Sequence, residues 1–123
     1  MSSAALVLLD SVTQVRPEHA GAVVVTGSHG GASVVTYALA VRAQLYVFND
    51  AGIGKDDAGI AALALLDAHG QAALAVAHSS ARIGEARDTF ESGVISRVNR
   101  AAAALGVAAG QALGVVCSRL ARG

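Results

Sequence analysis

Four short apolar runs constrain the fold of this chain more than any other feature of its sequence. Each run is continuous rather than alternating, which is typical of strands that are covered on both faces. The runs are AALVLL (4–9), AVVVT (22–26), QLYVF (44–48) and AALAVA (72–77). We therefore predict a mostly parallel sheet of about four strands. The direction of the first strand stays open, because the connection that follows it (10–21) can be either a crossover or a loop.

Segments in which apolar residues recur at helical spacing separate the later runs and follow the last one. The predicted helices span residues 31–42, about 56–70, 91–105 and 111–121. Asp56 is expected to cap the second helix, and Thr89 or Ser92 the third. Asn99 and Arg100 are expected to face solvent or a neighbouring subunit. The alternation of strands and helices predicts a small three-layer α/β/α sandwich.

Length, charge and composition exclude several classes of protein. Residues 1–123 suffice for a single α/β domain, and nine basic against nine acidic residues leave no net charge. With only four scattered aromatic residues, we expect no nucleic-acid binding. The TGSHGG segment interrupts the uncharged stretch 20–41, and the N-terminal residues lack a basic signal region, so we expect no membrane insertion.

The cysteine and the apolar content favour a location and an assembly state. The single cysteine, Cys117, is expected to be a small buried apolar residue, and it fits a protein of the reducing cytoplasm. Hydrophobic residues make up 54% of the chain. We therefore expect a homo-oligomer in which apolar helix faces are buried between subunits.

A polar cluster follows every apolar run on its carboxyl side. The clusters are Asp10-Ser11, TGSHGG (26–31), NDAGIGKDD (49–57) and HSSAR (78–82), whereas the turns that enter the strands are plainer. In open parallel sheets, ligands bind outside the carboxyl ends of the strands. We therefore expect a small-molecule site at this rim, with Asn49, Ser79 and Ser80 among its contacts. The alternative is that these residues serve only as solvated turns and caps.

The segment TGSHG matches the nucleophile-elbow pattern G-x-S-x-G except for Thr26 at its first position. Such an elbow exposes a serine oxygen above the end of a strand. Asp50 follows the next predicted strand and His78 the one after, so Ser28, Asp50 and His78 occur in the order that α/β-hydrolases use. This order predicts a catalytic triad. The alternative roles are a cap or turn for Ser28 and a hydrogen-bonded turn histidine for His78.

Amide and cationic groups at the same rim predict binding of an anion. Backbone amides near Gly30 and Gly31 are expected to hold an oxyanion, and His29 is expected to contact the substrate. The only lysine, Lys55, and the nearby Arg82 are expected to clamp a carboxylate or carbonyl group. The alternative for Lys55 is an exposed lysine of a surface loop.

Nucleotide, cofactor and metal sites are not predicted. A phosphate-binding loop ending at Lys55 would need glycine in place of Asn49 and a hydroxyl in place of Asp56, and no G-x-G-x-x-G is present. No histidines recur at the spacing of metal ligands. We therefore expect no cofactor and no metal.

Together these features predict a small cytoplasmic enzyme that acts on a small anionic or carbonyl-bearing metabolite. Hydrolysis is the most specific reaction that they favour, with Asp50 or His78 moving protons and Ser28 as nucleophile or ligand contact. Two alternatives stay open. One is a metabolite-binding or regulatory module without catalysis, and the other is a structural subunit of a homo-oligomeric assembly.

Overall fold

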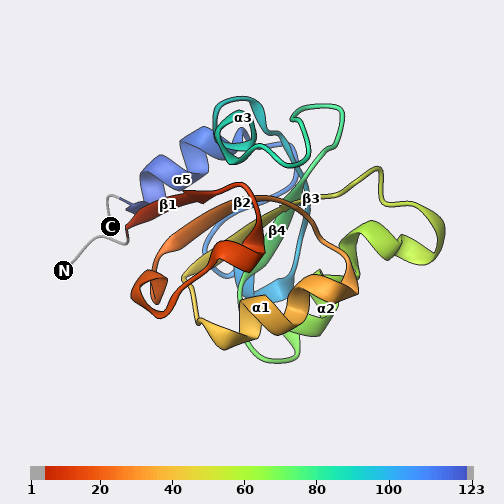
Figure 1. The fold of residues 1–123 in the computed structure, drawn as a ribbon. Helices are drawn as coiled ribbons and strands as arrows, with labels where there is room; N and C mark the ends of the chain where they lie inside the picture. The colour runs from red at the N-terminus through yellow and green to blue at the C-terminus, as the bar shows by residue number, and fades with distance from the viewer. Residues whose placement is uncertain (1–4, 122–123) are drawn as a thin grey trace.

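The computed structural model describes residues 5–121, so Ala4 of the first predicted strand lies outside the described residues. Its centre is a five-stranded sheet in which each strand lies beside its neighbour in the sequence (Figure 1). The strands are β1 (Leu6–Leu9), β2 (Val23–His29), β3 (Leu45–Asn49), β4 (Ala73–Val76) and β5 (Ile95–Val98). The first four run parallel, and β5 runs antiparallel to β4. The mostly parallel sheet is confirmed, and the first strand proves to be parallel to the second.

Helices cover both faces of the sheet. They are α1 (Val35–Ala40), α2 (Ala61–Asp67), α3 (Ala86–Ser92), α4 (Arg100–Ala103) and α5 (Leu113–Ala121). Four 3-10 turns precede or connect them: η1 (Val12–Gln14), η2 (Pro17–His19), η3 (Ala32–Val34) and η4 (Lys55–Ile60). Figure 1 shows α1 and α2 below the sheet and α3 and α5 above it. The three-layer α/β/α sandwich is therefore confirmed. No helix within residues 5–121 is long and apolar enough to cross a membrane.

The strand order explains which face each connection covers. Parallel strands that follow one another across a sheet are joined by right-handed crossovers, which place all of their connections on the same face. Accordingly η1, α1 and α2 share one core cluster below the sheet. The connection that follows β4 instead leaves toward the upper face and forms α3. The connections after the neighbouring strands β3 and β4 thus diverge to opposite faces, and such a divergence opens a crevice at the carboxyl ends of the strands.

Alternation along the strands divides the apolar residues between two cores. Val23 and Val25 of β2 pack under α5, whereas Val24 between them packs against α1 and α2. Burial of a valine stabilises the fold by about 1.5–3 kcal/mol. Cys117 of α5 is fully buried in the upper core, and burial raises the pKa of its thiol to about 12. The expected role of Cys117 as a buried apolar residue is confirmed.

The prediction of a helix over residues 91–105 is wrong. Residues 95–98 form β5, which pairs with β4, and only α4 (Arg100–Ala103) is helical in the second half of the predicted segment. The preceding helix ends at Ser92, and its N-cap is Glu85 rather than Thr89 or Ser92. Pairing with β4 buries Ile95 in the upper core, and β-branched residues suit a strand.

Asn99 is buried within the chain, contrary to the expectation that it faces solvent or a neighbouring subunit. Its side chain accepts hydrogen bonds from the amides of Ala73 (3.1 Å) and Ala102 (2.9 Å). The same side chain donates to the carbonyl oxygens of Leu63 (3.1 Å) and Gln71 (2.9 Å). Asn99 therefore joins β4, α2 and α4 at the end of the sheet opposite the polar rim.

The segment after β3 has an unusual backbone. Ala51, Ile53, Asp56 and Asp57 have φ angles of 53°, 66°, 55° and 57°. Non-glycine residues rarely adopt this left-handed region, which costs about 1–2 kcal/mol for each residue. The left-handed turn prevents a helix from starting here, so α2 begins at Ala61. The predicted N-cap at Asp56 is therefore wrong.

Candidate functional site

A pocket of about 740 Å³ opens where the connections after β3 and β4 diverge. Its volume lies within the range of small-molecule sites, about 300–1,000 Å³. The lining residues are Asn49, Ala51, His78, Ser79, Ser80, Ala81, Arg82, Ile83, Glu85 and Asp88. The predicted site residues Asn49, His78, Ser79, Ser80 and Arg82 therefore come together at the carboxyl ends of the two strands.

Hydrogen bonds fix the outer wall of the pocket, the connection from β4 to α3, against the sheet. The buried Asn49 donates from Nδ2 to the carbonyl oxygen of Ala81 at 3.1 Å. The Gly84 amide donates to the carbonyl oxygen of Gly27 at 2.7 Å. The Ser80 hydroxyl donates to a carbonyl oxygen of its own connection and accepts the Val94 amide, next to β5, at 2.9 Å. Because these contacts lie within the protein, the pocket wall is held in place without a ligand.

Asp50 and His78 meet beside the pocket, which His78 lines and Asp50 does not. The Asp50 side chain is only 5% exposed, and its Oδ1 accepts the amides of Gly52 (2.8 Å) and His78 (3.0 Å). Its Oδ2 accepts the Ser96 hydroxyl at 2.7 Å. His78 Nδ1 lies 3.4 Å from Asp50 Oδ1, and the His78 side chain, 62% exposed, lines the pocket. We call this pair the Asp50–His78 dyad.

The surroundings of Asp50 keep it charged. Burial raises the pKa of its carboxyl, but the Ser96 hydroxyl, the amides of Gly52 and His78 and the His78 ring lower it, and the net pKa is below the ordinary value. A carboxylate beside Nδ1 favours the histidine tautomer that carries its proton on that nitrogen. Nε2 of His78 then has a free lone pair on the side away from Asp50. A general base needs such an arrangement.

The stability of the protein is expected to depend on the ionisation of Asp50. Because its pKa is lower in the folded state, the charged form contributes stability above the unfolded pKa of about 3.9. That contribution is lost as the pH falls through the folded pKa. Urea unfolding should therefore show a drop below pH 4 that is larger in the wild type than in Asp50→Asn. An equal drop in both proteins would contradict the assignment.

Ser28 lies on the other face of the sheet. β2 continues through His29, so Ser28 is part of a strand and not of a sharp turn into a helix. Gly27 packs against the backbone of Gly84 on the upper face, and successive strand residues point to opposite faces. Ser28 Oγ accepts the Val12 amide at 2.9 Å, and within residues 5–121 no hydrogen bond joins it to His78. The predicted nucleophile elbow is wrong, and only two members of the predicted triad are brought together.

The glycine amides that were expected to hold an oxyanion are used within the fold. The Gly30 amide donates to the Asn49 carbonyl oxygen at 3.0 Å, and the Gly31 amide donates to His29 Nδ1 at 2.9 Å. A Cβ on Gly30 would lie 2.9 Å from the Gly59 carbonyl oxygen. Close packing of the backbone against the segment before α2 therefore explains this glycine. His29 and the two glycines are not among the residues that line the pocket.

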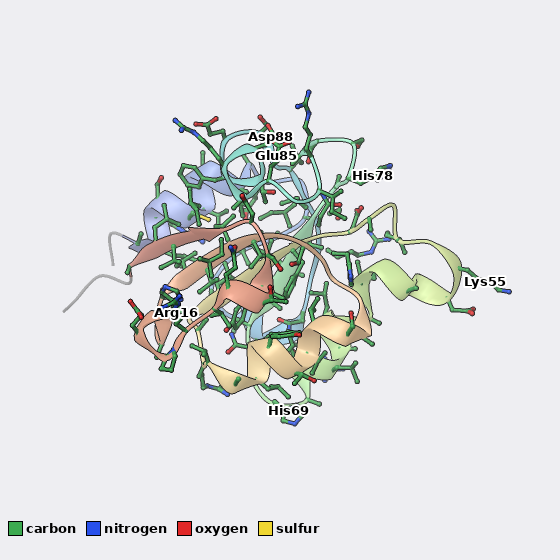
Figure 2. All side chains as sticks on the ribbon, in the orientation of Figure 1. Arg16, Lys55, His69, His78, Glu85 and Asp88 are labelled. Atoms are coloured by element: carbon green, nitrogen blue, oxygen red, sulfur yellow. The ribbon has the colours of Figure 1, made fainter. Side chains whose placement is uncertain are left out.

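The expected pair of cations is not assembled. Lys55 is exposed in η4 and projects away from the rest of the molecule (Figure 2), and it forms no ion pair with any residue of the described part. Arg82 Nη1 lies 3.8 Å from Glu85 Oε2. The backbone amide of Arg82 donates to Asp88 Oδ2 at 2.7 Å. One positive and two negative side chains, those of Arg82, Glu85 and Asp88, therefore line the pocket. Such a site does not attract a dianion such as phosphate.

Sequence reasoning assigned no site role to Ser96, Glu85 or Asp88. Ser96 reaches Asp50 from β5, which the helical spacing of apolar residues concealed. Burial along β5 runs from buried Ile95 through half-buried Ser96 to exposed Arg97 and does not alternate, so the sequence carries no period-2 signal for this strand. Among residues 5–121, no group of three or more histidine, cysteine, aspartate or glutamate side chains is arranged to hold a metal ion.

Comparisons of the chain with protein-family models, curated proteins and solved structures find no match. The chemistry of the site therefore rests on its own geometry. Its distinctive feature is the Asp50–His78 dyad, whose histidine lines a pocket of mixed charge.

Proposed function

We propose that the protein is a small hydrolase-like enzyme that acts on a small carbonyl-bearing metabolite in the pocket at the ends of β3 and β4. The observation that carries this proposal is the Asp50–His78 dyad. A buried carboxylate, held by the amides of Gly52 and His78 and by the Ser96 hydroxyl, lies beside Nδ1 of a histidine that lines the pocket. A histidine held in this way has a nitrogen ready to accept a proton.

In the proposed reaction His78 activates a water molecule. Nε2 takes a proton from the water as the water oxygen attacks the carbonyl carbon of the substrate. His78 then gives this proton to the leaving group and returns to its neutral form. Asp50 holds the ring in the required tautomer and stabilises the imidazolium that forms between the two steps. This route needs no serine nucleophile, in agreement with the position of Ser28 on the other face of the sheet.

The pocket wall favours a neutral or zwitterionic substrate over an anionic one. Arg82 can donate to a carbonyl oxygen through its guanidinium group. Glu85 and Asp88 on the same wall oppose the entry of a doubly charged anion. Ile83, 54% exposed at the pocket, offers contact to an apolar part of the substrate.

A cytoplasmic location forms part of the proposal. Its support is the single cysteine, which is buried and free. Exported domains of this size more often carry several cysteines in disulfides.

The test begins with a set of small esters, lactones and amides, screened for binding by NMR and then for hydrolysis. For a compound that is turned over, His78→Gln is expected to lower kcat by about 10²–10⁴-fold, because the general base is removed. The dissociation constant of the compound from His78→Gln should stay close to that from the wild type, since glutamine keeps the size and polarity of the side chain.

Ser28→Ala and Lys55→Met are the matched controls. Both positions lie outside the pocket lining, so kcat should stay within about twofold of the wild type in both variants. Ser28→Ala is also expected to be less stable than the wild type, because it leaves the Val12 amide without its partner. If Ser28→Ala lowered kcat as much as His78→Gln, a serine nucleophile would replace the water mechanism.

A metabolite-binding module without catalysis is the second candidate. Two observations favour it. The 3.4 Å separation within the dyad exceeds the hydrogen-bond range of about 2.6–3.2 Å. Several polar groups of the pocket, in Asn49, Ser80 and Asp88, are bonded within the fold. Binding of compounds from the set without turnover of any of them would support this candidate over the enzyme.

A further inference from the structure

Strand β1 forms an edge of the sheet, and its outer side is open. In the parallel ladder with β2, the Ala5 carbonyl oxygen accepts the Val23 amide, so residues 5, 7 and 9 direct their backbone groups toward β2. The amides and carbonyl oxygens of Leu6 and Leu8 therefore point away from the sheet. Within the described part of the chain these backbone groups have no hydrogen-bond partner.

The side chains of the same two residues are also exposed. Val7 and Leu9 pack against the lower core, so Leu6 and Leu8 face the side of α3 and α5. There they remain 37% and 41% exposed. An uncharged strand that presents both unpaired backbone groups and apolar side chains is a template for pairing with another strand.

The other edge of the sheet is protected. The Ile95 amide of β5 donates to the Gln111 carbonyl oxygen at 3.0 Å, and the Gly110 amide donates to the Ile95 carbonyl oxygen at 2.7 Å. Arg97 also places a charge on this strand. Edges are commonly blocked by such a covering segment or by a charge. β1 carries neither a charged residue nor a proline.

We propose that two copies of this chain pair through β1 in an antiparallel, two-fold symmetric arrangement. The two five-stranded sheets would then join into one continuous sheet. A second copy fits this edge because the strand complements itself. With Val7 opposite its own copy at the two-fold axis, Leu6 of each chain forms a hydrogen-bonded pair with Leu8 of the other, and all outward backbone groups are satisfied.

Charge and apolar contact agree with this pairing. β1 carries no charge that would be repeated across the axis, and the whole chain has no net charge. Residues directly opposite in an antiparallel pair project to the same face of the sheet. Leu6 and Leu8 of both chains therefore gather into one apolar cluster on the side of α3 and α5.

The register can be tested by exchanging charges at the paired positions. Leu6→Lys/Leu8→Lys places lysines opposite one another, whereas Leu6→Lys/Leu8→Glu places lysine opposite glutamate with the same loss of apolar surface. By analytical ultracentrifugation we expect the wild type to dimerise. The dissociation constant should rise at least 100-fold in the first variant and recover at least tenfold in the second. Leu39→Lys/Leu65→Lys, at exposed leucines of α1 and α2, should dimerise like the wild type.

A cross-link decides the question if the charged variants fail to fold. Cα atoms of a non-hydrogen-bonded antiparallel pair lie about 4.5 Å apart, a distance that a disulfide can span. Val7→Cys should therefore give a covalent dimer on mild oxidation, and Leu39→Cys should not. A wild type that stays monomeric at high concentration, a lysine–glutamate variant no tighter than the double lysine, or equal cross-linking of both cysteine variants would each overturn the proposal.

Discussion

Asp50→Ala is expected to lower the free energy of unfolding by about 3–5 kcal/mol. The carboxylate accepts the amides of Gly52 and His78 and the hydroxyl of Ser96, and alanine leaves both amides without their acceptor and Ser96 with only its longer contact to Ala75. A partly buried donor that loses its partner costs about 1–3 kcal/mol. Because the donors come from the segment after β3, from the connection after β4 and from β5, the loss should loosen the contacts among these three segments.

Asp50→Asn provides the matched control for this prediction. The amide oxygen of asparagine can still accept the two backbone amides, and Ser96 can redirect its hydroxyl to the Ala75 carbonyl oxygen, which already lies 3.3 Å away. We expect a loss of about 1–2 kcal/mol. Urea unfolding followed by far-ultraviolet circular dichroism at pH 7 measures both values. If Asp50→Ala were no less stable than Asp50→Asn, the hydrogen bonds to Asp50 would contribute little to stability.

Gly27→Ala is expected to destabilise the protein by about 3 kcal/mol through steric overlap. A Cβ at this position would lie 2.4 Å from the Glu85 nitrogen, 2.5 Å from the Gly84 carbonyl carbon and 2.8 Å from the Asp10 carbonyl oxygen. All three are backbone atoms, so no side chain can rotate away. The β4–α3 connection would have to lift from the end of β2, which breaks the hydrogen bond between Gly84 and Gly27 and opens the pocket wall.

Gly84→Ala in the same connection separates this overlap from backbone strain. Gly84 has a φ of 86°, and nothing lies within 4 Å of its hypothetical Cβ. Alanine there meets only the cost of the left-handed conformation, about 1–2 kcal/mol. Thermal and urea unfolding of the two variants should therefore rank Gly27→Ala below Gly84→Ala. The reverse order would show that the close approach between β2 and the connection contributes little.

The strands were predictable because their determinants are local. A run such as Leu45–Phe48 is buried at every position, and continuous apolarity indicates this directly. β5 was not predictable in the same way. Val94, Val98, Ala101 and Leu105 happen to match helical spacing, and the strand forms because pairing with β4 and cover by the following segment satisfy its backbone. That information lies in tertiary contacts.

The site was predictable in its position and only in part in its members. Asp50 and His78 follow adjacent parallel strands, so their meeting depends on a strand order that the sequence does not contain. Ser28 does not join the Asp50–His78 dyad because β2 extends to His29 and the Ser28 hydroxyl is directed toward Val12. Lys55 does not reach the pocket because residues with left-handed backbone conformation on both sides of it direct the turn outward. In each case a local conformation decided the direction of one side chain.

The strand order also matches the order of synthesis. Each of β2, β3 and β4 docks onto the strand made just before it, so the sheet can grow in one direction as the chain leaves the ribosome. Growth stops at β5, which reverses direction and is covered by the segment around Gly110 and Gln111. The opposite edge, β1, is not covered by another segment within the described part of the chain. On the proposed pairing, chains that emerge from neighbouring ribosomes on one messenger could therefore associate through β1 before either is complete, and the subunits of a dimer would tend to come from the same transcript.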